Sequence, residues 1–269
     1  METIFSKNNN NVKFVRSLNE KKFRVKNNAF YLEGIKVVNE ILDKNEAIDI
    51  MFIAYSKSIL VNLNGGKDII ERIEKLENIK VFEFEENIFK YVTDTITPQG
   101  ILIVLKIPKY DFEEIISQNS NNILILDKVQ DLGNLGTIIR SCNAFDIDII
   151  LCTSGTADVY SPKALRSTMG GILNTKIIYL EGLNKLEVLK KNGYKIVTTS
   201  LNTDNYISSL SMKEKYAFVM GNEANGVSSE VEEKSDIIVK IPMSNKIESL
   251  NVGVATSIIL YEQYKDKNI

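Results

Sequence analysis

Residues 236–260, DIIVKIPMSNKIESLNVGVATSIIL, decide the fold class of this chain of 269 residues. An apolar run over 236–243 indicates a strand, a polar stretch must then loop out, and a helical pattern covers 249–265. Four earlier apolar runs, ILIL, DIIL, IVTTSL and YAFVMG, occupy 123–126, 148–151, 196–201 and 216–221. Helix-like segments at 135–145, 161–169 and 183–192 separate them. Because the runs are continuously apolar, we predict an α/β fold with a buried, mostly parallel sheet covered on both faces.

Ligands of such sheets bind beyond the carboxyl ends of the strands. The segment DLGNLGTIIR at 131–140 follows one strand, and it suggests a helix that Asn134 caps and that carries Arg140 on its second turn. Arg140 is one of only five arginines among 33 basic residues, and arginine suits planar or phosphate recognition better than lysine does. A capped helix with a solvated arginine explains this segment equally well when it is taken alone.

Two further segments lie at the same predicted edge. GNEANG at 221–226 follows a strand and presents Glu223, while Ser249 and Asn251 stand where the last helix begins. Free backbone N–H groups at a helix start can bind a ligand, although capping or an exposed turn would explain each residue by itself. Convergence of three polar loops on one edge predicts a functional site.

The residue types exclude several chemistries. The chain has no His, which rules out Ser-His-Asp and Cys-His catalysis and His-ligated metals. Cys142 and Cys152 form no CxxC pair and are expected to be small buried residues, so no metal site is predicted. Neither GxGxxG nor a Walker loop occurs, which disfavours a nucleotide-dependent enzyme of the phosphate-cradling kind.

Charge and composition divide the chain. The polar run SQNSNN at 117–122 predicts a linker, and we place a domain boundary there, with units 1–117 and 118–269. Apolar periodicity in the first unit predicts a smaller mixed α/β domain. The net charge is −2, but residues 13–26 carry six basic residues and one acid, so this basic segment is +5. No apolar run approaches a membrane span or a signal peptide, so a cytoplasmic protein is expected.

Taken together, NLGTIIR, FVMGNEANGV and IPMSNKIESLNVGVATSIILYE resemble the three motifs of the SpoU/TrmH family of RNA ribose 2′-O-methyltransferases. The order and spacing match over about 120–265. The first unit resembles the substrate-binding domain that often precedes the catalytic domain in this family. The resemblance implies an S-adenosylmethionine (AdoMet)-dependent enzyme with a C-terminal trefoil knot and a homodimer with active sites at the subunit interface.

The resemblance also implies roles for particular residues. The implied catalytic set is Arg140, Asn134, Glu223, Ser249 and Asn251. The implied AdoMet-binding set is Thr199, Met220, Gly221, Ile241, Met243 and Leu250. Candidate RNA contacts are Arg24 and Lys22 in the basic segment, with Lys163 and Arg166 in the segment SPKALRSTMGG. A solvated basic surface or a plain amphipathic helix would explain these four cations as well.

Arg140 acts in the implied chemistry either as the base for the 2′-hydroxyl or by stabilising the forming alkoxide. The ordinary pKa of arginine, above about 12, disfavours the first role, but the sequence leaves both open. We also expect Glu223 to pair with Arg140 and hold its guanidinium. Ribosomal RNA is the expected substrate. Transfer RNA, or a catalytically silent RNA-binding relative that assists ribosome assembly, are the alternatives.

Overall fold

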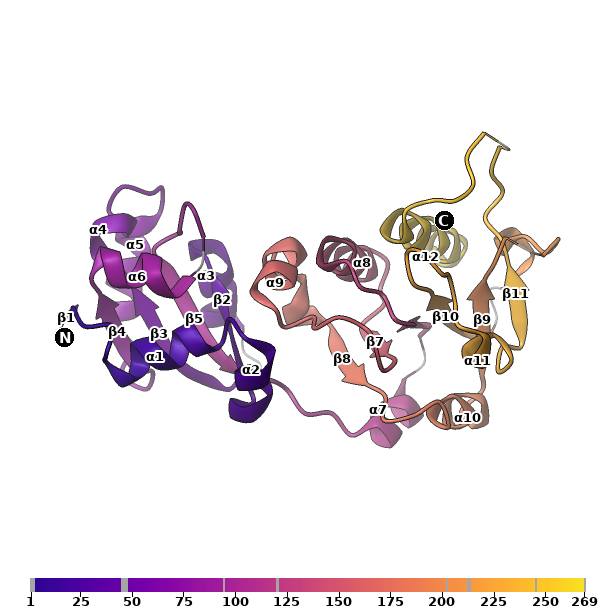
Figure 1. The fold of residues 1–269 in the computed structure, drawn as a ribbon, viewed down its shortest axis with the longest axis horizontal. Coiled ribbons are helices and arrows are strands. Elements are labelled where there is room, and N and C mark those ends of the chain that lie inside the picture. Colours follow the sequence, from indigo (N-terminus) through magenta and orange to yellow (C-terminus); the bar gives the residue numbers. More distant parts are fainter. Residues whose placement is uncertain are drawn as a thin grey trace. The chain divides into compact units, whose positions relative to one another are not determined.

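The computed structural model describes residues 3–44, 48–93, 95–119, 121–201, 203–211, 214–244 and 246–268. The chain divides into two compact units (Figure 1). The first comprises Met1–Pro108 with Tyr160–Arg166, and the second comprises Lys109–Val159 with Ser167–Ile269. The boundary therefore falls before the polar run in which the sequence analysis placed it.

The first unit is built on a mixed sheet of five strands, in the order β1-β4-β3-β5-β2. Its strands are β1 (Thr3–Ile4), β2 (Ala29–Glu33), β3 (Ile50–Tyr55), β4 (Val81–Phe84) and β5 (Ile101–Lys106). Its helices are α1 (Asn10–Ser17), α2 (Lys21–Asn27), α3 (Ile35–Asp43), α4 (Lys57–Leu60), α5 (Gly66–Glu74) and α6 (Glu86–Thr93). β5 pairs antiparallel with β2 and β3, whereas β4 pairs parallel with β1 and β3. The predicted mixed α/β character of this region is confirmed.

The basic segment 13–26 is folded rather than an extended arm, because it supplies most of α1 and all but the last residue of α2. Val12, Val15 and Leu18 are fully buried at a spacing of three residues, which gives this region a helical apolar face. They pack with α6 over one face of the sheet. The lysines of the segment remain on the solvent side of these helices, so its charge is presented on a rigid surface.

Arg24 is the exception among the basic residues of this segment. Its side chain is only 3% exposed, and its guanidinium donates a hydrogen bond of 2.6 Å to the carbonyl oxygen of Leu18. A side chain buried to this extent does not present its guanidinium at the surface, so the structure supports a structural role for Arg24 and not its predicted RNA contact. The sequence does not reveal this, because the hydrogen bond depends on how α2 folds back on the end of α1.

The second unit is built on six strands that pair only in parallel, in the order β11-β9-β10-β6-β7-β8. They are β6 (Ile123–Leu126), β7 (Ile149–Cys152), β8 (Lys176–Tyr179), β9 (Tyr194–Thr199), β10 (Lys215–Met220) and β11 (Ile237–Val239). The predicted parallel sheet is confirmed. β8 was not predicted, although Ile177, Ile178 and Tyr179 form an apolar run; it lies at the edge of the sheet, where only Ile177 of this strand is buried.

The helices of this unit are α7 (Phe112–Gln118), α8 (Leu132–Ala144), α10 (Lys185–Lys191), α11 (Ser229–Glu232) and α12 (Val252–Asn268), with short 3₁₀ turns η1 (Gly171–Asn174) and η2 (Ile207–Ser209). Of these, α8, α10 and α12 were predicted. α9 (Pro162–Thr168) was also predicted, but its residues up to Arg166 group with the first unit. α12 packs along α8.

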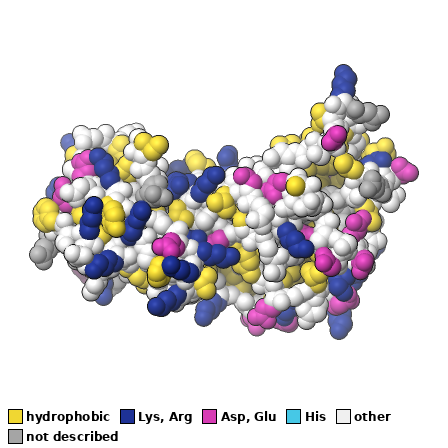
Figure 2. All heavy atoms as spheres, viewed as in Figure 1, with side chains coloured by type: hydrophobic (Ala, Val, Ile, Leu, Met, Phe, Trp, Pro, Cys, Tyr) yellow, Lys and Arg dark blue, Asp and Glu magenta, His cyan; other side chains and the backbone are white. Residues whose placement is uncertain are grey.

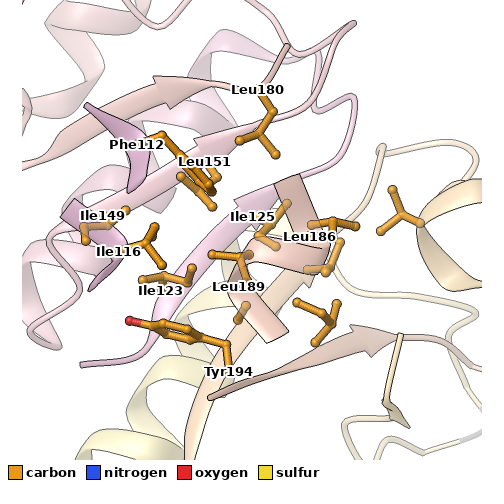
Figure 3. Packing of buried hydrophobic residues seen from close by; sticks show 14 residues of the cluster. Phe112, Ile116, Ile123, Ile125, Ile149, Leu151, Leu180, Leu186, Leu189 and Tyr194 are labelled. Carbon is orange, nitrogen blue, oxygen red and sulfur yellow. The ribbon is translucent and has the colours of Figure 1, made fainter. Parts of the chain in front are cut away.

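A hydrophobic core against β6 and β7 explains why the domain boundary lies before residue 109 and not in the polar run 117–122 (Figure 3). Phe112 and Ile116, which lie one helical turn apart on α7, are buried in this core together with Ile123 and Ile149. Residues 109–117 therefore belong to the fold of the second unit, since their apolar face is part of its core.

Both cysteines lie in the interior of the second unit, as predicted, and burial raises the pKa of both thiols, that of Cys152 to about 12. No group of metal-ligating residues occurs among the described residues. Within the same described part of the chain, no helix is both long enough and apolar enough to cross a bilayer.

Glu33, at the end of β2, should make the first unit less stable as the pH rises. Burial raises its pKa from 4.5 to about 6, although the N–H of Gln99 and the charge of Arg166 oppose the shift. The folded state then holds the Glu33 proton at pH values where the unfolded chain has released it, so this group lowers the free energy of unfolding between about pH 4.5 and 6.

We therefore expect Glu33→Gln, which keeps an oxygen acceptor for the Gln99 N–H, to stabilise the protein by about 1–2 kcal/mol above pH 7 and by nothing below pH 4. Urea unfolding at the two pH values measures this difference. Glu77→Gln, at an exposed glutamate of the same unit, is the control. Equal effects of Glu33→Gln at both pH values would contradict the assignment.

Candidate active site

The candidate site lies where the order of the sheet reverses. β6 sits between β10 and β7, so the chain runs outward from β6 through β7 to β8 and then returns to build the other half of the sheet. Crevices at such switch points are where open α/β sheets bind ligands. The loop after β6 and the loop after β10 meet here, since the Asn222 side chain donates a hydrogen bond of 2.9 Å to the Lys128 carbonyl.

A chain of side-chain hydrogen bonds joins the three predicted motifs. Asn134 Nδ2 donates to Glu223 Oε1 at 3.0 Å, and Asn251 Nδ2 donates to Asn134 Oδ1 at 2.9 Å. A carboxylate can only accept, so Glu223 fixes the direction of both amides. The oxygen of Asn251 then accepts from the N–H of Gly253 at 2.9 Å. The predicted convergence of Asn134, Glu223 and Asn251 is thus present as one directed network.

Glu223 also anchors the start of α8 through the backbone. Its two oxygens accept hydrogen bonds from the N–H groups of Gln130 (3.1 Å) and Asp131 (2.9 Å). Burial raises the pKa of Glu223, but the hydrogen bonds from Asn134, Asp131 and Gln130 outweigh it and hold the pKa below its usual range. The carboxylate is therefore ionised at neutral pH and suited to positioning rather than to proton transfer.

The predicted Glu223–Arg140 pair is wrong. Glu223 uses its oxygens on the α8 terminus and on Asn134, and no ion pair to Arg140 occurs among the described residues. Arg140 lies on α8 six residues beyond Asn134, about 9 Å along the axis, with an exposed side chain that has no described hydrogen-bond partner. Its guanidinium is left available for a ligand.

The predicted cap of α8 is also wrong by one turn. The helix begins at Leu132 and its N-cap is Asp131, whose Oδ1 accepts from the N–H of Asn134 at 2.8 Å. Asn134 is thus inside the first turn, which frees its amide for Glu223 and Asn251. The sequence carried a usable signal, because aspartate at a helix start caps at least as well as asparagine.

The predicted position of Asn251 at the start of the last helix is confirmed, but α12 begins at Val252 and not at 249. Asn251 is the residue before Val252 and caps the helix with its side-chain oxygen, which accepts from the N–H groups of Gly253 and Val254. A Cβ at Gly253 would lie 3.1 Å from the side chain of Thr137, so the two helices approach closely there. Ser141 and Ser257 share a hydrogen bond of 2.7 Å further along. Ser249 is exposed and has no hydrogen bond within the described residues.

The six predicted AdoMet-binding residues come from one side of the site, at the carboxyl ends of the neighbouring strands β11, β9 and β10 and before α12. Thr199 and Met220 end β9 and β10, and Gly221 follows Met220. Ile241, Met243 and Leu250 are half-buried in the segment between β11 and α12.

These residues fit an adenosine-containing ligand. Half-buried apolar side chains alternate there with backbone whose N–H groups, at 241, 243–244 and 246–250, donate to no other described group. Apolar walls with unpaired backbone donors can hold a purine and a ribose without a glycine-rich phosphate loop. Glycine is required at position 221 by the turn beside this segment, since a side chain there would overlap the backbone of Gly226 and Val227.

The remaining predicted RNA contacts are exposed. Lys163 and Arg166 lie on α9, and Lys22 on α2 makes an ion pair of 3.0 Å with Glu20. Two contributors to the site, the backbone N–H groups of Gln130 and Asp131, could not be predicted from the sequence, because every residue except proline carries such a donor.

Two family models and several known proteins match this chain. Residues 121–261 match the model of the SpoU rRNA Methylase family, and residues 9–103 match that of the MRM3-like substrate binding domain. A relative in Bacillus subtilis, named 23S rRNA (guanosine(2553)-2′-O)-methyltransferase RlmP, is 32% identical over 97% of this chain and 98% of its own length. An uncharacterized tRNA/rRNA methyltransferase of Borreliella burgdorferi is 29% identical over 74% of this chain and 93% of its own.

Solved structures agree with this result over almost the whole chain. An rRNA methyltransferase from Sinorhizobium meliloti, also solved with AdoMet bound, has a TM-score of 0.86 and 26% identity, with 98% of each chain covered. A Porphyromonas gingivalis protein described as a putative RNA methyltransferase of the TrmH family has a TM-score of 0.80 and 28% identity, covering 96% of this chain and 98% of its own. From the three motifs, the network that joins them and these matches, the chain belongs to the SpoU rRNA methylase family.

Proposed function

We propose that this protein is an AdoMet-dependent RNA ribose 2′-O-methyltransferase that acts on ribosomal RNA. The observation that carries the proposal is the Glu223–Asn134–Asn251 network, which assembles all three family motifs at the switch point of the sheet. The preference for ribosomal RNA rests on the full-length likeness to a relative named as a 23S rRNA methyltransferase.

AdoMet bound beside Gly221 would supply a methyl group on a sulfonium, whose leaving group is a neutral thioether. The ribose 2′-oxygen forms a bond to the methyl carbon as the carbon–sulfur bond breaks, and the hydroxyl proton is released. The protein has to align the hydroxyl and stabilise the charge that develops on its oxygen.

We assign that stabilisation to Arg140. Its guanidinium is exposed and has no carboxylate partner among the described residues, so its positive charge is uncompensated. A guanidinium offers five N–H donors and no acceptor, so it is suited to stabilising an anion and not to accepting a proton. A charged Arg140 beside the forming alkoxide, with solvent accepting the proton, is therefore favoured over Arg140 as a base.

Glu223, Asn134 and Asn251 act as positioning residues in this proposal. They tie the start of α8, the 221–226 loop and the start of α12 to one another, so the helix that carries Arg140 has a defined place relative to the AdoMet-binding segments. Ser249 stands exposed beside this network and is available to the ribose.

The first unit is the RNA substrate-binding domain of the proposal, and Lys22, Lys163 and Arg166 are its candidate phosphate contacts. Their exposure supports this assignment, since each neutralised phosphate adds affinity that falls with salt. An enzyme of ribosomal RNA meets its substrate in the cytoplasm, which is the location we propose.

We further propose a homodimer that buries an apolar stripe on α12. Val254, Ile258 and Tyr261 are 46%, 37% and 50% exposed, and their spacing of four and three residues puts them on one face of the helix. Ile258→Glu should convert the dimer to a monomer in light scattering of the purified protein. A wild-type protein that is monomeric at micromolar concentration would contradict the dimer.

A C-terminal trefoil knot belongs to the same proposal. β11 is at one edge of the sheet, whereas α12 packs on α8, the helix that follows the central strand β6. The segment between β11 and α12 must therefore return across the carboxyl edge of the sheet, as a knotted path requires. An experimental electron-density map that traces this segment without threading would contradict the knot.

Mapping of 2′-O-methyl groups across total RNA, in cells with and without the protein, tests the proposed activity. Loss of one ribosomal RNA methyl group is the expected result. Loss from a transfer RNA instead would replace the substrate, and no change at any site would favour the silent RNA-binding alternative.

A further inference from the structure

The first unit contains a small cavity on its own surface, formed where α1, α2 and α6 meet. Its volume is about 240 Å³, and its walls include Lys13 and Arg16 of α1, Asn19 and Glu20 of the connecting turn, Phe23 of α2 and Tyr91 of α6. On the face drawn in Figure 2, Lys and Arg side chains gather over this unit. The cavity thus combines concave shape, two aromatic rings and positive charge.

Two cations lie near the ring of Tyr91. The residue is 38% exposed, and the Nζ of Lys7 lies 4.6 Å from the ring centroid. The guanidinium carbon of Arg16 lies 5.1 Å from the same centroid, and Arg16 Nη1 donates a hydrogen bond of 3.0 Å to the Tyr91 carbonyl. The guanidinium is therefore fixed over the ring, and a flat cation on an aromatic platform is a surface on which nucleobases stack.

Phe23 supplies the second ring, and it too has a cation near it, because the Nζ of Lys22 lies 4.8 Å from its centroid. Glu20 carries the one carboxylate of the cavity lining and is paired with Lys22 at 3.0 Å. A carboxylate among cations can accept a hydrogen bond from the amino group of a base, whereas it would weaken a site for bare phosphate.

The walls of the cavity are rigid before any ligand arrives. Asn19 Nδ2 donates to the Val92 carbonyl at 2.9 Å, and the Tyr31 hydroxyl donates to Asn19 Oδ1 at 2.7 Å. These two bonds tie the turn between α1 and α2 to α6 and to the sheet. Binding therefore costs little ordering of the protein, which favours a small planar ligand.

We propose that this cavity binds one unpaired nucleotide of the substrate RNA. Its base stacks on the Arg16–Tyr91 surface against Phe23, and Lys7, Lys13 and Lys22 contact the adjoining phosphates. The inference rests on the proposed RNA substrate but adds a subsite far in sequence from the catalytic motifs. An acidic protein segment would contact the cations but would not fill the cavity or stack on its two rings. RNA is therefore the favoured occupant.

Binding of the full-length protein to a short unpaired RNA and to a blunt RNA duplex, measured by fluorescence anisotropy, tests the subsite. We expect Tyr91→Ala to weaken binding of the unpaired RNA about tenfold and to leave duplex binding nearly unchanged. Tyr91→Phe should bind as the wild type does, since it keeps the ring. Arg16→Gln should weaken binding similarly and lower the salt dependence of the affinity by about one ion.

Matched controls separate the cavity from general surface effects. Tyr206→Ala removes another exposed tyrosine that has a lysine 5.3 Å from its ring centroid but does not line this cavity, and Lys67→Gln removes an exposed charge elsewhere in the first unit. Melting curves establish that each variant is folded. If Tyr91→Ala and Arg16→Gln both bind unpaired RNA as these controls do, the subsite is refuted, and an acidic protein partner becomes the better occupant.

This test does not depend on methyl transfer. Selective loss of unpaired-RNA binding with no methyl group missing in cells would support the subsite and refute the proposed activity. A missing ribosomal methyl group with unaltered binding in the cavity variants would do the reverse.

Discussion

Arg140→Ala should abolish methyl transfer, lowering kcat by at least about 10²–10³-fold, while AdoMet affinity stays close to that of the wild type. The reason is that different parts of the proposed site serve catalysis and AdoMet binding. Arg140 is exposed on α8 without a described partner, so its removal leaves no packing defect, whereas the segments proposed to bind AdoMet follow β9, β10 and β11. The substitution should therefore weaken the stabilisation of the transition state and leave the affinity for AdoMet unchanged.

Single-turnover methyl transfer to ribosomal RNA, together with calorimetric titration of AdoMet, measures the two quantities separately. Arg140→Lys keeps the charge but loses the planar fork and should recover only part of the rate. Arg72→Ala, which breaks an ion pair of 2.6 Å with Asp43 in the first unit, is the control and should leave kcat unchanged. Normal turnover by Arg140→Ala would remove Arg140 from the mechanism.

Gly221→Ala is the second substitution with a large expected effect. A Cβ at this position would overlap the backbone of Gly226 and Val227, neither of which can rotate away as a side chain could. The turn that it would push against is closed by two backbone hydrogen bonds between Asn222 and Gly226, of 2.8 and 2.9 Å. Opening that turn displaces Glu223 and the wall proposed for AdoMet together.

We expect Gly221→Ala to lose detectable AdoMet binding and methyl transfer, and to destabilise the second unit by about 1–3 kcal/mol. Calorimetry and thermal unfolding are the measurements. Gly171→Ala serves as the matched control, because its Cβ would meet only side chains of Asn143 and Ile139 at 3.4 Å. Wild-type AdoMet affinity in Gly221→Ala would show that the turn can yield and that Gly221 is not part of the cofactor wall.

Local pattern was sufficient for most of the second unit. Continuous apolar runs identified five of its six strands, and polar groups after strands pointed to Asn134, Glu223 and Asn251. The misses have physical causes. β8 is short and at an edge, α7 belongs to a core that its own sequence does not reveal, and the cap of α8 was assigned to Asn134 although Asp131 occupies it.

The basic segment shows the same limit in the first unit. Its charge of +5 was visible in the sequence, and it suggested a nucleic-acid contact despite the net charge of −2. The basic side chains of this segment acquire different roles only when the chain folds. Arg24 is buried within the unit, whereas Arg16 is fixed over Tyr91, which lies 75 residues away in the chain.

By itself, the sequence determined most of the elements that form and the chemistry that is available. With no histidine in the chain, the motifs leave Arg140 as the residue on which the proposed catalysis rests. The tertiary structure alone decided the pairing of the polar groups, with Glu223 bonded to Asn134 and not to Arg140. The physical reason is distance along the chain. The hydrogen bonds of the network join residues 89 and 117 positions apart, and only the strand order brings them within 3.0 Å.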